Sequence, residues 1–248
     1  VPRLDSRVVH RVDPTGPRKS REVEVGSSSR VPPHLRVAMA AADDFDGTGL
    51  QTWCCAAVLA ATVAGAPLRV RPGLRVLEVG GGAGALAIAC ARAGGVVVST
   101  DVPRCAAAMR STFAAEAAGV SARLEARGLW FGDDVSDRDF DVVVASEVLY
   151  WPALTVLDGD TLAPLIETLA AVCGRCSCPA FVAFKRRDAG REARFFRLAA
   201  AAGFEARDVG LRVPRGFVDP DPPDGPGVGD LRCVELTLPS ARHGARPS

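Results

Sequence analysis

The chain has 248 residues, of which 48% are hydrophobic and 24% are charged. This length and apolar fraction predict one large domain, alone or with an extension, that can build an ample hydrophobic core. The formal net charge of +1 gives no electrostatic reason to expect nucleic acid or an anionic membrane as a partner, and no apolar run is long enough to cross a bilayer.

The first 40 residues are rich in Arg, Pro and Ser and predict an extension with little order of its own. Within it, residues 21–25 alternate in polarity and predict a short strand. The excess of Arg favours a solvated arm over a binding patch. Residues 241–248 predict a flexible tail, which leaves residues 41–240 as the predicted folded domain.

Strand patterns alternate with helix patterns through this domain. The predicted helices are 53–63, 84–93, 105–118, 161–172 and 191–202. The predicted strands are 75–79, 96–100, 122–126, 141–145 and 180–184, followed by a pair at 204–211 and 231–238. The alternation predicts an α/β fold with a doubly wound, mostly parallel sheet and helices on both faces, and the last pair predicts an antiparallel C-terminal hairpin.

The most informative segment is Val-Leu-Glu-Val-Gly-Gly-Gly-Ala-Gly at residues 76–84. A strand, a glycine turn, a helix and a second strand that ends at Asp101 form the pattern of a nucleotide-type cofactor site. The glycines let the backbone turn sharply and approach a ligand closely. An acid at the end of the second strand can hold the two hydroxyls of a ribose.

Two cofactor patterns fit these glycines. Gly80, Gly82 and Ala85 satisfy a loose dinucleotide pattern, whereas Gly80, Gly82 and Gly84 after Glu78 satisfy the S-adenosyl-L-methionine (SAM) pattern of the doubly wound methyltransferases. Glu78 favours SAM, because a carboxylate at the strand end would repel a pyrophosphate and is tolerated by a sulfonium cofactor with an ammonium group. A tight turn without a ligand is disfavoured by four glycines between a buried strand and a helix.

Several segments together carry a family resemblance: Gly49-Leu-Gln-Thr-Trp53 through Leu59, the glycine motif with Glu78, Thr100-Asp101, Leu129-Trp130-Phe-Gly132, Val144 to Tyr150, and Phe184-Lys-Arg-Arg187. In this ordered set the chain resembles the eukaryotic seven-strand protein-lysine methyltransferases of the methyltransferase-like 21 group (methyltransferase family 16), over about residues 45–238. The resemblance implies a Rossmann-like seven-strand sheet, SAM as the cofactor, and a lysine of a partner protein as the acceptor.

The resemblance also implies two catalytic residues after the strand 141–145, where open α/β sheets place ligands. Glu147 would orient the acceptor amine, and Tyr150 would line the channel of the amine. The family usually has Asp where this chain has Glu147, which moves the carboxylate one methylene outward. The alternative is a loop carboxylate that caps the next helix and a Tyr that packs on Trp151.

The same resemblance implies roles in cofactor binding. Asp101 would bind the ribose, Trp130 would stack on the adenine, and Trp53 would close the methionine end of the pocket; each Trp could equally be a core residue. The residues expected to bind SAM are Trp53, Glu78, Gly80, Gly82, Gly84, Asp101, Trp130 and Ser146.

Other charged segments favour structural interpretations. Asp133 and Asp134 could approach the adenine amino group, but an exposed acidic turn is the expected role. The run Lys185-Arg186-Arg187 could meet an acidic partner, but we expect a solvated strand end.

The eight cysteines are scattered, several of them in apolar helical runs where a thiol acts as a small hydrophobic group. Their scatter favours a reducing compartment over a disulfide scaffold, so we expect a cytoplasmic protein, with the nucleus as the alternative. Cys173, Cys176 and Cys178 could bind zinc from a helix-to-strand loop, but no fourth ligand is evident. The three His, at 10, 34 and 243, fall in segments expected to be flexible, so no metal site is predicted.

The leading hypothesis is a monomeric, SAM-dependent protein-lysine N-methyltransferase (EC 2.1.1). A methyltransferase for RNA or a small molecule is the second hypothesis, and the near-neutral charge without a basic stripe makes RNA the weaker of these substrates. A non-catalytic SAM-binding interaction module is the third, since Glu147 replaces the usual Asp. An NAD-dependent oxidoreductase is the least favoured.

Overall fold

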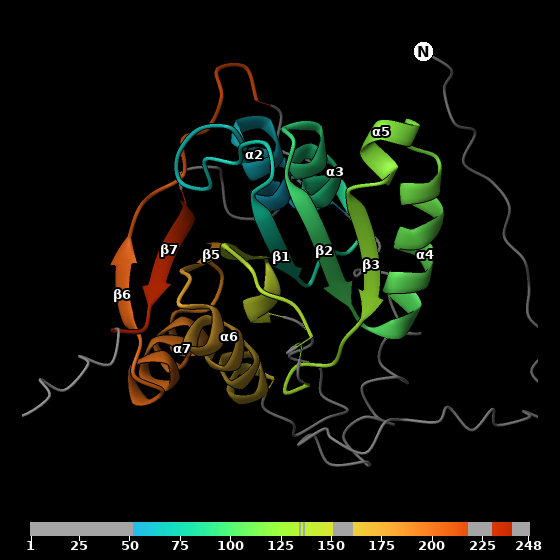
Figure 1. Cartoon of the computed structure of the whole chain (residues 1–248). Coiled ribbons are helices and arrows are strands. Elements are labelled where there is room, and N and C mark those ends of the chain that lie inside the picture. The colour runs from blue at the N-terminus through green and yellow to red at the C-terminus, as the bar shows by residue number, and fades with distance from the viewer. Residues whose placement is uncertain (1–51, 134, 136, 151–160, 218–229, 240–248) are drawn as a thin grey trace, which may run out of the picture.

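The computed structural model describes residues 52–133, 135, 137–150, 161–217 and 230–239 (Figure 1). Seven strands form one sheet in the order β3-β2-β1-β4-β5-β7-β6. The strands are β1 (Arg75–Val79), β2 (Val96–Asp101), β3 (Leu124–Gly128), β4 (Val142–Ser146), β5 (Ala180–Lys185), β6 (Glu205–Asp208) and β7 (Leu231–Thr237). The helices are α2 (Cys54–Thr62), α3 (Ala85–Arg92), α4 (Pro103–Ala114), α5 (Ala118–Ser121), α6 (Leu162–Cys176) and α7 (Ala189–Ala201), with a 3₁₀ turn η2 (Val148–Tyr150).

The predicted α/β class, with a mostly parallel sheet and an antiparallel C-terminal edge, is confirmed. Strands β1 to β5 pair in parallel, whereas β7 pairs antiparallel with both β5 and β6. The strand order reverses between β1 and β4, which are direct neighbours. Open α/β sheets bind ligands at such a reversal, outside the carboxyl ends of the strands.

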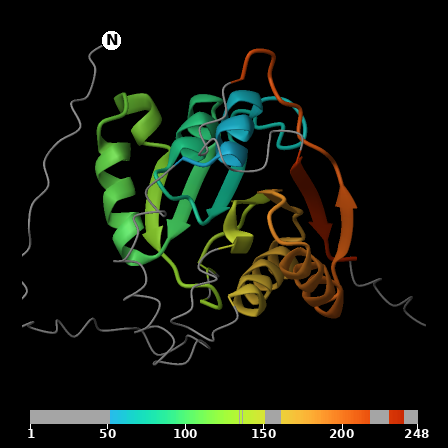
Figure 2. The same cartoon turned by 180° about the vertical axis from the view of Figure 1, so that it is seen from behind.

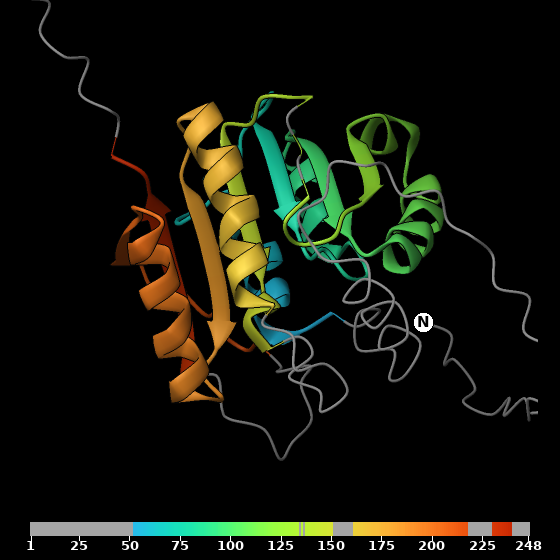
Figure 3. The ribbon, with the colours of Figure 1, turned by 90° about the horizontal axis from the view of Figure 1, so that it is seen from below.

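The sheet separates two hydrophobic cores. Helices α2, α3 and α4 cover one face, and their buried side chains pack against alternate residues of the strands, such as Val76 and Val144 (Figures 1 and 2). Helices α6 and α7 lie along the opposite face, over Leu77 and Val143 (Figure 3). The inner strands β4 and β5 are buried along their whole length, as expected for parallel strands covered on both sides.

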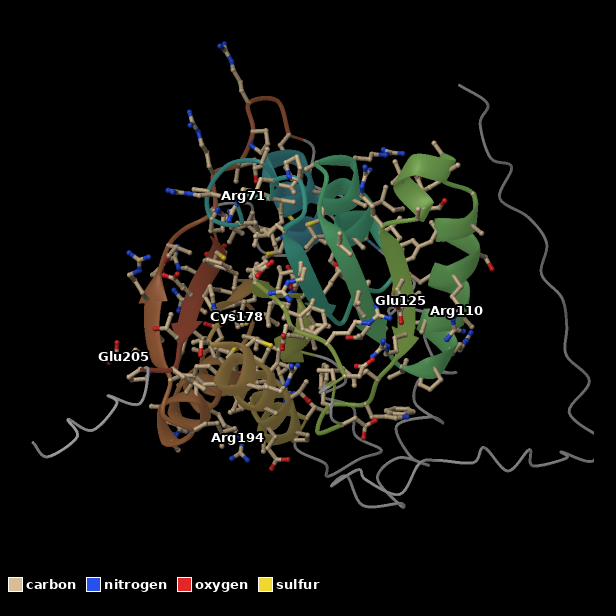
Figure 4. The ribbon with its side chains drawn as sticks, in the orientation of Figure 1. Arg71, Arg110, Glu125, Cys178, Arg194 and Glu205 are labelled. Atoms are coloured by element: carbon tan, nitrogen blue, oxygen red, sulfur yellow. The ribbon has the colours of Figure 1, made fainter. Side chains whose placement is uncertain are left out.

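The outer edge of the sheet is polar. All four residues of β6 are exposed, and Glu205 on this strand lies at the rim of the molecule, whereas Cys178 lies in the interior (Figure 4). A short, charged edge strand discourages pairing with another chain. The strand ends earlier than predicted because the carboxylate of Asp208 accepts a hydrogen bond from the Gly210 N–H at 2.8 Å, which forms a turn.

Two helix boundaries also differ from the prediction. The helix predicted over 105–118 is divided, because the backbone of Ala117 is extended (ψ 141°) before the short α5 begins. Helix α6 continues four residues beyond its predicted end, through Gly174, and stops only where Ser177 adopts a left-handed conformation. Cys173 and Cys176 are therefore helical residues and do not lie in a loop, which corrects the expectation.

The whole predicted N-terminal extension (1–40), with its predicted strand at 21–25, and the tail at 241–248 lie outside the described residues. None of the helices in the described part of the chain combines the length and apolarity needed to cross a membrane.

Candidate functional site

The glycine turn joins β1 to α3 at the reversal point of the sheet. Gly80, Gly82 and Gly84 have φ values of 76°, 54° and 82°, in the left-handed region that favours glycine. The N–H groups of Gly80 and Gly81 both donate to the carbonyl oxygen of Thr100, at 2.8 and 2.9 Å. These bonds fix the turn against the end of β2, so that it lies beside Asp101.

Glu78 lies beneath this turn, in the interior of the protein. Its side chain is 2% exposed, and its Oε2 accepts a hydrogen bond from Ser99 Oγ at 2.5 Å. Burial raises the pKa of Glu78 to about 7; the nearby charge of Asp101 adds to the increase, and the Ser99 bond opposes it. A Cβ at Gly81 would lie 2.8 Å from Oε2 of Glu78 and 2.1 Å from Ser99 Oγ, so only glycine fits over this carboxyl.

Asp101 ends β2 at the edge of the turn, as predicted. Its Oδ2 accepts a hydrogen bond from the Gly82 N–H at 2.8 Å, and its Oδ1 accepts one from the Val102 N–H at 2.8 Å. The carboxylate is half-buried. Since each carboxylate oxygen can accept more than one hydrogen bond, Asp101 retains acceptor capacity for hydroxyl groups.

Trp130 follows the end of β3, next to Asp101. The N–H of Leu129 donates to the Asp101 carbonyl oxygen at 2.8 Å, which fixes the chain just before Trp130. The Trp130 side chain is half-buried. Asp133 accepts from the Trp130 backbone N–H at 3.1 Å, so this acid shapes the turn, and it is half-buried and not exposed as expected. Asp134 lies outside the described residues.

The end of β4 brings two polar side chains to the same edge. Ser146 is 8% exposed, and the side chain of Glu147 is 5% exposed. Ser146 Oγ and Glu147 Oε1 have no hydrogen-bond partner among the described residues. Glu147 also has a φ of 60°, in a region that non-glycine residues rarely adopt. Buried oxygens without partners and an unusual backbone conformation make the end of β4 a candidate site.

The other oxygen of Glu147 pairs with a cation. Oε2 accepts a hydrogen bond from Nη1 of Arg187, a residue just beyond β5. The guanidinium carbon of Arg187 lies 5.6 Å from the centre of the Trp53 ring, within the range of a cation–π interaction. Glu147, Arg187 and Trp53 thus form one cluster from the segments just after β4, just after β5 and just before α2, and the sequence interpretation did not identify it.

The buried thiol of Cys55 lies close to the carboxylate of Glu147. Burial raises the pKa of Cys55 far above its usual value, and the nearby Glu147 carboxylate raises it further. A neutral thiol is a weak donor, so Oε1 of Glu147 keeps no N–H or strong O–H partner in the described part of the structure.

The expectation of a solvated strand end at Lys185-Arg186-Arg187 is wrong for Lys185, whereas Arg186 and Arg187 are exposed but paired with acids. Lys185 is 1% exposed, and Arg186 pairs with Glu192 at 3.2 Å. Glu192 also accepts the Arg187 N–H at 3.0 Å, in the first turn of α7. These bonds fix the backbone from which Arg187 reaches Glu147.

Arg191 positions the segment that follows Glu147. Its Nε donates to the carbonyl oxygen of Leu149, and its Nη2 donates to Thr161 Oγ1 at 2.6 Å. The bond to Leu149 ties the η2 turn to α7. The backbone of Tyr150 lies in η2, three residues beyond Glu147, as the predicted motif requires.

The cysteines are free thiols, and seven of the eight are buried. Cys173 and Cys178 form a hydrogen-bonded pair, which raises the pKa of Cys173 and lowers that of Cys178. Among the residues that the structure describes, no group of three or more potential ligands is arranged to hold a metal ion.

These residues provide a site that fits SAM. The glycines of the turn carry no side chains, so a ligand can lie close to its backbone. Asp101 has acceptor capacity for ribose hydroxyls, and Ser146 Oγ is a buried polar atom without a partner among the described residues. Glu78 beneath the turn does not suit a pyrophosphate, which a dinucleotide would place there. The donor and acceptor set therefore favours SAM over NAD.

The comparisons with known proteins agree with this geometry. A model of the lysine methyltransferase family matches residues 36–202. Among solved structures, the glycopeptide N-methyltransferase MtfA bound to SAM aligns with a TM-score of 0.54 and 15% identity, over 76% of this chain and 95% of that chain. The same enzyme bound to S-adenosyl-L-homocysteine aligns with a TM-score of 0.54 and 16% identity, over 84% and 98%.

Identities this low establish the shared fold and nothing further. No sequence among the curated proteins matches this chain. The family match covers well over half of the residues, and the solved methyltransferase MtfA shares the fold of this chain. The chain therefore belongs to the lysine methyltransferase family, and it has the fold of the SAM-dependent methyltransferases.

Proposed function

We propose that this protein transfers a methyl group from SAM to the side-chain amine of a lysine on a partner protein. The observation that carries the proposal is the buried carboxylate of Glu147, which keeps one oxygen without a partner among the described residues and lies at the same sheet edge as the glycine turn. Membership of the lysine methyltransferase family supports the same acceptor.

SAM supplies a methyl group on a sulfonium, which an amine can attack in line. In the proposed arrangement, the turn Gly80–Gly84 and Ser146 hold the amino-acid part of SAM, Asp101 binds the ribose, and Trp130 stacks on the adenine. When it is ionised, Glu78 contributes a negative potential beneath the turn, which favours a cation above it. The protein has little covalent chemistry to perform, so the rate depends mainly on positioning.

The acceptor must lose a proton before it can attack, because the pKa of a free lysine ammonium is about 10.4. A narrow, poorly hydrated site lowers that pKa. Glu147 would accept a hydrogen bond from the amine through Oε1 and so direct the nitrogen lone pair, and Tyr150 would line the channel. Trp53 offers an aromatic face for the ammonium.

The proposal takes residues 41–240 as the catalytic domain of a monomeric enzyme in a reducing compartment such as the cytoplasm, with the nucleus as the alternative. The free thiols support a reducing location.

The test is the incubation of the full chain and [methyl-³H]SAM with a hypomethylated lysate. Samples are then treated with protease or ribonuclease and separated from small molecules. A labelled band that protease removes, and that contains methyl-lysine after hydrolysis, supports the proposal. Label that ribonuclease removes, or label confined to the low-mass fraction, overturns it in favour of RNA or a metabolite.

Glu147→Gln is the matched variant for this experiment. We expect it to lose transfer at least about 100-fold, the scale of a positioned polar group in catalysis, while calorimetry finds SAM affinity unchanged. Full transfer by Glu147→Gln would remove this residue from the mechanism. No transfer by the wild type, with SAM bound, would favour the non-catalytic module.

A further inference from the structure

The cluster around Glu147 already contains a bound cation, and this cation is part of the protein. The Arg187 guanidinium lies over the face of Trp53 and pairs with the carboxylate of Glu147. An aromatic face and a carboxylate are the two groups that would hold an acceptor ammonium. In the protein without a substrate, the Arg187 side chain therefore occupies the two groups that would bind an acceptor cation.

We propose that Trp53 and Glu147 form the cation subsite for the acceptor and that Arg187 fills this subsite until a protein substrate displaces it. The inference rests on the proposed function for the identity of the acceptor. Its consequence is specificity: a free amine has to compete with a tethered guanidinium, whereas a lysine on a protein brings binding energy from surfaces remote from the site.

Three observations favour displacement over a permanent structural pair. The Arg187 side chain is 27% exposed, whereas Glu147 is 5% exposed, so the cation can move toward solvent while the carboxylate stays in place. The Arg187 backbone is fixed independently, because its N–H donates to Glu192 Oε1 at 3.0 Å. The second oxygen of Glu147 is buried and has no partner among the described residues, so the carboxylate has hydrogen-bonding capacity that Arg187 leaves unused and that an ammonium replacing the guanidinium can use.

The expected change in affinity for a small cation follows from its competition with the Arg187 side chain. When a binding-competent state is populated only a fraction of the time, the apparent dissociation constant rises by the inverse of that fraction. If Arg187 fills the subsite about 90% of the time, a small cation should bind about tenfold more weakly than it would to the empty subsite.

The test uses n-butylammonium, which matches the end of a lysine side chain, and n-butanol as its neutral counterpart. Binding to the full chain is measured by ligand-observed NMR, without SAM and without any methyl transfer. We expect Arg187→Met to bind n-butylammonium about tenfold more tightly than the wild type, and Arg187→Met/Glu147→Gln to lose that gain. Neither protein should bind n-butanol more tightly.

Arg186→Met is the matched control, because Arg186 is the adjacent residue and pairs with Glu192 outside the subsite. It should bind n-butylammonium as the wild type does. An Arg187→Met variant that binds the cation no better than Arg186→Met would overturn the proposal.

A second measurement needs no variant, in case the loss of Arg187 prevents folding. In the wild-type protein labelled with ¹⁵N, the Arg187 Nε–Hε resonance should move as n-butylammonium saturates the subsite, and n-butanol should not move it. A resonance that stays fixed at saturation contradicts displacement. Since neither readout requires methyl transfer, a failure here is distinct from a failure of the lysate experiment, which tests the proposed function.

Discussion

Replacement of Glu78 by Gln tests how burial beneath the glycine turn affects stability. The carboxyl is enclosed on all sides, and burial raises its pKa from the ordinary value of 4.5 to about 7. Gln has nearly the same shape, and its carbonyl oxygen can still accept the Ser99 hydroxyl bond seen at 2.5 Å. The variant therefore removes the ionisable group and keeps the packing.

The direction of the pH dependence of stability follows from how the folded and unfolded states bind the Glu78 proton. Between pH 4.5 and about 7, the unfolded chain loses the Glu78 proton while the folded protein keeps it, so stability falls as the pH rises. Each pKa unit corresponds to about 1.36 kcal/mol, so the interval from 4.5 to about 7 corresponds to a loss of about 3 kcal/mol. Glu78→Gln should match the wild type near pH 4.5 and exceed its stability by about 3 kcal/mol at pH 8.

The assay is urea denaturation of both proteins across pH 4.5 to 8, without SAM, followed by fluorescence. A gain of this size raises the melting temperature by on the order of 10 °C for a chain of this length. A difference in unfolding free energy between Glu78→Gln and the wild type that is the same at pH 5 and pH 8 would refute the assigned effect of burial.

Glu125 on β3 is the control of opposite sign (Figure 4). Partial burial would raise its pKa, but the hydrogen bonds and charges of Arg127 and Arg138 outweigh burial and hold the pKa below its usual value. A lowered pKa stabilises the fold above the unfolded value and is lost as the pH falls. Glu125→Gln should therefore lose stability at neutral pH, where Glu78→Gln gains it.

Three further predictions concern the turn, the ribose acid and the core. Gly81→Ala should destabilise the protein by about 1–3 kcal/mol in urea denaturation, since its Cβ would lie 2.1 Å from Ser99 Oγ. Gly119→Ala is the control, because a Cβ there would have no atom within 4 Å, and it should not destabilise the protein. Equal effects of the two substitutions would exclude the steric explanation. Asp101→Asn should weaken SAM binding by calorimetry about 10- to 100-fold, and it should also lower the melting temperature, because the amide can accept only one of the two backbone N–H bonds; unchanged affinity would remove Asp101 from the ribose site. Phe195→Ala, at a fully buried position, should cost about 3–5 kcal/mol in urea denaturation, and half-buried Phe196→Ala less; the reverse order would contradict the packing.

The glycine turn was predictable because its signal is local. A buried strand, four glycines and a helix pattern lie within about 20 residues, and the left-handed φ values at Gly80, Gly82 and Gly84 match the positions that the motif selects. Asp101 was predictable for the same reason, since neighbouring parallel strands end at one edge of the sheet. The central strands were equally clear because their apolar runs are buried throughout.

Helix ends were less predictable where the signal is weak. A glycine at position 174 is unfavourable inside a helix, yet α6 continues because Cys173 and Cys176, on either side of it, pack into the core. Tertiary burial of two residues outweighs the modest cost of one glycine inside a helix, which is about 1 kcal/mol. At α4 the Ala-rich sequence carries no stop signal, so the break before α5 could not be located from composition.

The pairing of Arg187 with Glu147 was not predicted, for a reason that concerns the site itself. A run of three basic residues at a strand end looks solvated because sequence shows only its immediate neighbours. The register of β4 and β5 aligns Ser146 with Ala183, and the Glu147 N–H donates to the Ala183 carbonyl oxygen at 2.8 Å. That pairing brings residues 40 positions apart to one edge. A basic side chain beyond β5 then has a buried carboxylate within reach, and burial makes the pairing necessary: an ionised carboxylate that is 5% exposed requires a cation or strong donors. Pairing partners for acids at strand ends should therefore be sought on the next parallel strand before they are assigned to solvent.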